Sequence, residues 1–89
     1  LPRIGPDLAE WMASKRIGVL GVEPPAVADP HNIEEITAIH RTLLRAHILI
    51  VEGLTNLEAI SREKVTFIAL PLKIERGDGS PVRALAIEE

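Results

Sequence analysis

The chain has 89 residues, 46% of them hydrophobic, and its only aromatic residues are Trp11 and Phe67. This length and composition predict a single small domain over residues 1–89 with an aliphatic core. The net charge of −3 without a basic run argues against nucleic acid as a partner. The absence of cysteine excludes disulfides, thiolate metal sites and cysteine nucleophiles.

Nothing in the sequence indicates a membrane. It holds no run of 18 apolar residues, no signal peptide and no lipidation motif, so we expect a cytoplasmic protein. The chain opens on Leu1 rather than on an initiator Met, which is expected of a piece of a longer protein. Simple processing is the alternative.

The first elements are a helix and a strand. Gly5-Pro6-Asp7 is a favourable helix entry, and Lys15 and Arg16 are expected to close that helix at its negative end. Residues 17–22 form a compact apolar run that predicts a strand, and Pro24-Pro25 predicts a loop after it.

A second helix and strand complete a βαβ unit. Asn32 and Glu35 resemble a capping box at the start of a helix over residues 33–46. Residues 48–51 follow as a second strand, and the helix between the two strands makes a parallel pair with a crossover.

The remaining elements predict a β-hairpin. A short helical piece is expected over residues 57–60 and a third strand over 65–74, with Pro71 marking an edge or bulge. The turn signal at 77–80 leads to a fourth strand over 82–87, antiparallel to the third. The expected fold class is therefore α/β, a βαβ unit plus a hairpin within a mixed sheet. The continuous apolar strands need cover on both faces, so we expect a missing segment or another chain on one of them.

His40 and Glu52 form the candidate site. His40 lies on the apolar arc that Ile36 and Leu43 define, and Glu52 ends the second strand, where ligands bind in α/β units. Imidazole and carboxylate together suit Zn²⁺, Mn²⁺ or Fe²⁺. On periodicity alone, a neutral core histidine with satisfied ring nitrogens accounts for His40 equally well, and two ligands are one or two short of a site.

Four sequence segments and the spacing of one residue pair resemble one known family in their order along the chain. They are GVLGVEPPAVADP (18–30), the spacing of His40 and Glu52, EGLTNL, IALPLK (68–73) and DGSPVRA (78–84). Over residues 17–86 the chain resembles the C-terminal half of the cyclase-like metal-dependent hydrolases, the family that includes bacterial kynurenine formamidase. The resemblance implies a fold of the swivelling β/β/α type that is incomplete without the upstream half.

The resemblance also implies a function. His40 would bind one ion of a dinuclear centre and Glu52 would bridge or share both, with zinc as the first expectation for the metal and manganese or iron as alternatives. A metal-activated water would hydrolyse a small amide, either a formamide, as in tryptophan catabolism, or a cyclic substrate. The missing N-terminal half would supply an HxGTHxD motif and an acid/base histidine, so this chain holds no catalytic residue and is expected to be inactive alone. A homo-oligomer is expected.

Other polar residues fit the resemblance less closely. His31 and His47 match no ligand position, and a surface or packing role is expected for both. Glu23 stands where the family commonly has Asp, and that loop is expected to border the substrate pocket. Ser80 and Arg83 are expected to shape a turn, with Arg83 in an ion pair, and direct contact of either residue with substrate is the alternative. The alternative to a hydrolase half is a non-catalytic remnant that self-associates through an uncovered sheet face.

Overall fold

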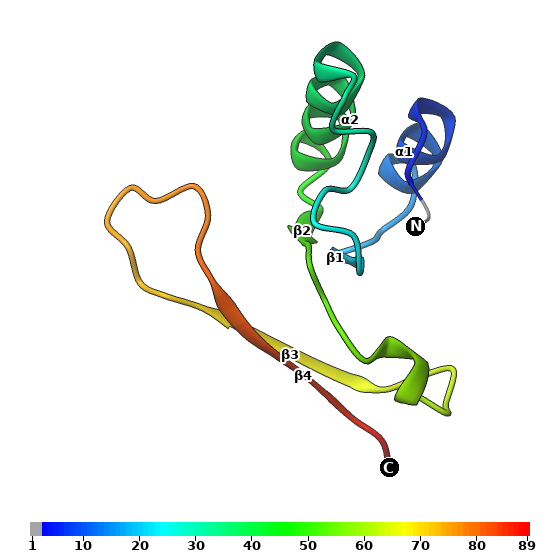
Figure 1. The fold of residues 1–89 in the computed structure, drawn as a ribbon, viewed down its shortest axis with the longest axis vertical. Helices are drawn as coiled ribbons and strands as arrows, with labels where there is room; N and C mark the ends of the chain where they lie inside the picture. The colour runs from blue at the N-terminus through cyan, green and yellow to red at the C-terminus, as the bar shows by residue number, and fades with distance from the viewer. Residues whose placement is uncertain (1–2) are drawn as a thin grey trace. The chain divides into compact units, whose positions relative to one another are not determined.

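The computed structural model describes residues 3–89 and divides into two compact units, Leu1–Thr55 and Asn56–Glu89. The first unit contains α1 (Pro6–Ala13), β1 (Val19–Gly21), α2 (Ile33–Arg45) and β2 (Leu49–Val51). The second contains the 3-10 helix η1 (Leu57–Ala59), β3 (Thr66–Pro71) and β4 (Val82–Ile87) (Figure 1). None of the helices described in residues 3–89 has the length and apolar content needed to cross a membrane.

The first unit is the predicted βαβ unit. β1 and β2 pair in parallel, with Val19 opposite Leu49 and Gly21 opposite Val51, and α2 forms the crossover. Hydrogen bonds continue the pairing beyond the strands, because the Gly53 N–H donates to the Pro24 carbonyl at 2.9 Å. The loop that follows β1 is thereby fastened to the segment that carries Glu52.

The start of α2 is fixed as the sequence predicts. The Asn32 side-chain oxygen accepts the Glu35 N–H at 3.1 Å, and its amide nitrogen donates to the Glu35 carboxylate at 3.0 Å. These bonds satisfy one of the free N–H groups of the first turn and hold the two side chains together. The predicted cap is confirmed.

The end of α2 depends on His47. This residue has a φ of 61°, in the left-handed region that usually favours glycine. In that conformation the His47 N–H donates to the Leu44 carbonyl and the Ile48 N–H donates to the Leu43 carbonyl, both at 3.0 Å. His47 therefore ends the helix and turns the chain into β2.

The first helix ends earlier than the sequence suggests. α1 stops at Ala13, and no basic residue lies in its last turn, so the expectation that Lys15 and Arg16 close it is wrong. The Ser14 hydroxyl donates to the Trp11 carbonyl at 2.6 Å, a local bond that competes with continuation of the helix. The Lys15 ammonium instead lies 5.4 Å from the centre of the Trp11 ring.

The core lies entirely within the first unit and is aliphatic, as composition predicts. The buried apolar residues come from α1, from the loop after β1, from α2 and from the residue just before β2: Ala9, Val27, Ala28, Ile39, Leu43 and Ile48. Both aromatic residues are exposed, Trp11 at 55% and Phe67 at 39%. Side-chain packing in this unit therefore depends on a small number of methyl-rich contacts.

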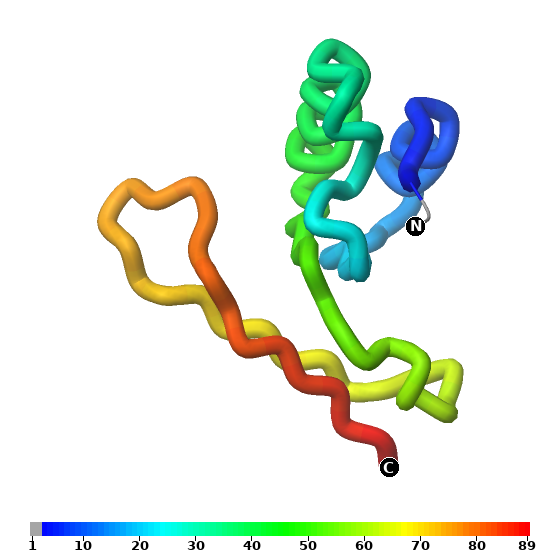
Figure 2. The backbone as a smooth tube through the Cα atoms, in the orientation of Figure 1, coloured from blue at the N-terminus to red at the C-terminus, as the bar shows by residue number. Residues whose placement is uncertain are grey.

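The second unit is the predicted hairpin, visible as the yellow and red segments in Figure 2. β3 and β4 pair antiparallel from Thr66 opposite Ile87 to Pro71 opposite Val82, and Pro71 is the last residue of its strand. The connecting loop forms a turn over residues 74–77, where Arg76 has a φ of 56° and the Gly77 N–H donates to the Ile74 carbonyl. The turn predicted at 77–80 therefore begins a few residues earlier.

The mixed α/β class is confirmed, with one parallel and one antiparallel two-stranded sheet in the described chain. No residue of Asn56–Glu89, all of which the structure describes, is buried. Leu70 and Leu85 of the hairpin are 75% and 51% exposed. That a missing segment or another chain covers these apolar strands stays a prediction from the sequence.

Candidate metal centre

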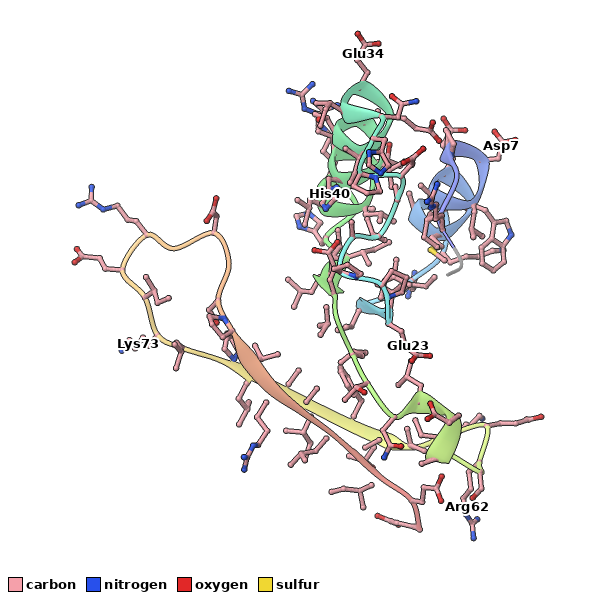
Figure 3. All side chains as sticks on the ribbon, viewed as in Figure 1. Asp7, Glu23, Glu34, His40, Arg62 and Lys73 are labelled. Atoms are coloured by element: carbon pink, nitrogen blue, oxygen red, sulfur yellow. The ribbon has the colours of Figure 1, made fainter. Side chains whose placement is uncertain are left out.

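The fold brings the two predicted ligands together. His40 lies on α2, where Figure 3 labels it, and Glu52 directly follows β2. The His40 Nε2 atom is 3.8 Å from the Glu52 Oε2 atom. Both residues belong to the first unit, so this proximity is a property of the βαβ unit itself.

The ring of His40 is oriented by its own helix. Its Nδ1 atom lies 2.8 Å from the Ile36 carbonyl oxygen, one turn earlier. A carbonyl only accepts hydrogen bonds, so Nδ1 carries the proton in this contact. In the neutral ring, the lone pair is then on Nε2, the nitrogen that faces Glu52. A backbone carbonyl on the second ring nitrogen is the usual arrangement around a histidine that binds a metal.

His40 lies at the edge of the core rather than inside it. Its side chain is 33% exposed, whereas Ile39 and Leu43 are the buried residues of α2. Ile33, at the start of the same helix, is 70% exposed. His40 therefore lies on the core side of α2, at the edge of the core beside the buried Ile39 and Leu43.

Glu52 is held by a backbone donor. Its Oε2 atom accepts the Val27 N–H at 2.7 Å, the short distance typical of a bond to a charged group. The 3.8 Å separation from His40 exceeds hydrogen-bonding range, so the two side chains are not bonded to each other. Two tetrahedral ligands at ~2.1 Å from one ion lie ~3.4 Å apart. The observed separation is close to that value, and the nitrogen and oxygen donors suit zinc, manganese or iron.

The other residues singled out by sequence lie elsewhere. Residues 3–89 contain no cluster of three or more potential metal-binding side chains, so neither His31 nor His47 joins the pair. The His31 N–H donates to the Asp29 carboxylate, and His47 ends α2. Ser80 accepts the Leu72 N–H at 3.0 Å, which supports its role in shaping the hairpin loop. Arg83 forms no ion pair with any residue that the structure describes, so that expectation is wrong.

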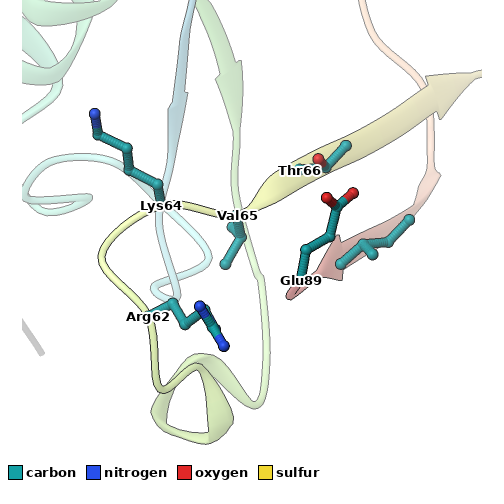
Figure 4. A pocket seen from close by; sticks show the side chains of 6 residues that line it. Arg62, Lys64, Val65, Thr66 and Glu89 are labelled. Atoms are coloured by element: carbon teal, nitrogen blue, oxygen red, sulfur yellow. The ribbon is translucent and has the colours of Figure 1, made fainter.

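A shallow pocket also lies in the second unit. Six residues line it: Arg62, Lys64, Val65, Thr66, Ile87 and Glu89. Figure 4 shows the Lys64 side chain pointing away from Glu89. Beside it, hydrogen bonds from the Ser61 N–H and hydroxyl hold the pKa of the Glu88 carboxyl below its ordinary value. These bonds tie the end of the chain after β4 to the segment before β3.

Sequence reasoning missed Val27. The group that contacts Glu52 is a backbone N–H, which every residue except proline carries, so no side-chain signature announces it. The only signal was an apolar Val27-Ala28 pair inside a proline-flanked loop, and both residues are buried to 1% exposure. Such a pair indicates a loop packed into the core.

Comparison with known proteins gives the family. No family model matches the chain. The kynurenine formamidase of Bacillus anthracis is 36% identical over 85 residues, and a solved structure described as a potential metal-dependent hydrolase with cyclase activity matches with a TM-score of 0.77 at 30% identity. Over most of its own length the chain is similar to one part of the cyclase-like metal-dependent hydrolases. The family resemblance predicted from the sequence motifs is confirmed.

Further relatives named kynurenine formamidase match over nearly the same extent. The kynurenine formamidases of Bordetella avium and Geobacillus thermodenitrificans are 34% and 38% identical over 83 and 84 residues. The match covers 96% of this chain but 39% of the Bacillus anthracis relative, and 90% of this chain but 38% of the solved structure. The chain thus spans about two fifths of the length of its relatives.

Proposed function

We propose that this chain contributes two ligands, His40 and Glu52, to the divalent metal of a kynurenine formamidase-like amide hydrolase. The observation that carries the proposal is the geometry of the pair: a histidine nitrogen with no hydrogen on it in the neutral ring, 3.8 Å from a carboxylate oxygen. The names of the relatives and of the matching structure support the reaction class and the requirement for a metal.

Each residue has a defined part in such a site. His40 would donate its Nε2 lone pair, while the Ile36 carbonyl keeps the ring from rotating. Glu52 would contribute a negative charge that offsets the charge of the cation. A divalent ion held there, zinc first and manganese or iron as alternatives, supplies Lewis acidity that activates water against the amide carbonyl. Neither residue is assigned the proton transfer, since both would be occupied by the metal.

The rest of the site is proposed to come from outside the chain. A centre of this type takes three or more protein ligands, and the described residues provide two. We propose that an upstream HxGTHxD segment supplies the others and that an upstream histidine is the acid/base group. Hydrolysis of a small formamide therefore requires that segment together with this chain.

The alternative function, self-association by a non-catalytic domain, has one observation in its favour. Leu49 and Leu70, one from each unit, are 65% and 75% exposed, so apolar surface is present. Self-association gives no reason for the Nε2 atom of His40 to face Glu52 without a hydrogen bond between them. The hydrolase proposal accounts for that arrangement.

Substitution of His40 tests the proposal in the full-length protein. His40→Ala should lower divalent-metal affinity at least tenfold and abolish hydrolysis of an aryl formamide, because loss of a ligand leaves the ion under-coordinated. His31→Ala removes an exposed histidine from a loop and should change neither property. Metal content after equilibrium dialysis and hydrolysis rate are the two readouts. Unchanged metal affinity in a folded His40→Ala protein would show that the assignment is wrong.

A further inference from the structure

Among residues 3–89, the Glu52 carboxylate accepts one hydrogen bond in addition to its approach to His40. The Val27 N–H, 25 residues earlier in the chain, donates to Oε2 at 2.7 Å. The Glu52 side chain is 32% exposed, so solvent offers it other rotamers and other hydrogen-bond partners. The Val27 N–H therefore favours the conformation in which the carboxylate approaches His40.

Val27 is itself held from three directions. Its side chain is 1% exposed and packs in the core with Ile39 and Leu43 of α2, the helix that carries His40. Its carbonyl accepts the Ile4 N–H at 2.9 Å, so both polar backbone groups of Val27 are engaged. A donor anchored in this way has little freedom to move away from Glu52.

The same loop is also fixed to the end of β2. The Pro24 carbonyl accepts the Gly53 N–H at 2.9 Å, one residue after Glu52. The loop thus contacts the helix that carries one proposed ligand and the strand end that carries the other. It therefore connects the two elements that carry the proposed ligand pair.

We propose that the Val27 N–H is the positioning group for Glu52 and that residues 22–30 set the geometry of the metal centre before the metal binds. This inference rests on the function proposed above. A carboxylate oxygen has two lone-pair directions, so Oε2 accepts the Val27 N–H with one and keeps the other for the ion. Loss of such an outer partner costs ~10- to 100-fold in metal affinity.

A pair of substitutions at one position separates the backbone donor from the side chain. Val27→Pro removes the N–H, whereas Val27→Ala keeps it and shortens the apolar side chain. In the full-length protein, Val27→Pro should weaken zinc binding at least tenfold, as measured by competition with a chromophoric chelator. Val27→Ala should stay within about threefold of the wild-type affinity. Equal weakening by the two variants, or unchanged affinity of a folded Val27→Pro protein, overturns the proposal.

Hydrogen exchange tests the same bond in a protein without the proline. In the metal-free full-length protein, Glu52→Ala should speed exchange of the Val27 amide about tenfold or more. The Ile4 amide, which donates to a backbone carbonyl, should exchange as in the wild type. An unchanged Val27 exchange rate in Glu52→Ala shows that the bond is absent and overturns the proposal. This readout involves no metal, so its result is independent of the ligand assignment of His40.

Discussion

Leu43 and Leu44 give a direct test of the proposed core. They are adjacent on α2, yet Leu43 is fully buried and Leu44 is 52% exposed. Leu43→Ala removes three buried carbon atoms at about 0.8 kcal/mol each, about 2.4 kcal/mol, and the remaining cavity raises the loss of unfolding free energy to about 3 kcal/mol. Leu44→Ala should cost about 1 kcal/mol or less, because its side chain keeps half of its contact with water.

Urea denaturation of the full-length protein, followed by circular dichroism, measures both changes. The two variants carry the same substitution in the same helix, so differences in helix propensity cancel between them. A difference of about 2 kcal/mol corresponds to about 1 M urea at an m value of about 2 kcal/mol/M. If the two variants lose equal stability, the packing of α2 described above is incorrect.

Two further predictions concern the backbone and a carboxylate. His47→Gly should stabilise the protein by about 0.5 kcal/mol in the same denaturation assay. Glycine adopts the left-handed conformation without the steric cost of a Cβ atom, and this gain is partly offset by the greater entropy of glycine in the unfolded chain. His47→Ala keeps the Cβ atom and should give no gain, so equal gains in the two variants would refute the reasoning. Hydrogen bonds from Ser61 lower the pKa of the Glu88 carboxyl below its ordinary value of 4.5. The stability that these bonds contribute is therefore fully present above pH 4.5 and is lost as the pH falls through the lowered pKa. The Ser61 amide resonance should therefore shift on acidification below about pH 4.5, and a shift that persists in Glu88→Gln would assign it to another group.

The sequence was sufficient for the order and type of the elements. Apolar runs separated by a capped amphipathic helix predicted β1, α2 and β2, and Asn32 placed the start of α2 correctly because a cap is a local interaction. The approach of His40 to Glu52 also follows from local order, since a crossover helix packs beside the strand that it precedes.

What the sequence could not give depends on tertiary contacts. The wheel of α2 fixes the spacing of its apolar residues, but the packing of α1 decides that Ile39 and Leu43 are buried and that His40 lies at the edge. The contact between Val27 and Glu52 spans 25 residues and uses a backbone group, so no residue pattern encodes it. The end of α1 was misplaced because the Ser14 hydroxyl bond competes with helix continuation.

The ligand assignment of His40 is tested most directly by nitrogen NMR of the full-length protein during zinc addition. The Nε2 resonance of His40 should shift at stoichiometric zinc, while the resonances of His31 and His47 remain unchanged, because within residues 3–89 His40 alone has that nitrogen within 4 Å of a carboxylate oxygen. Stoichiometric zinc binding that leaves the His40 Nε2 resonance in place would contradict the proposed centre.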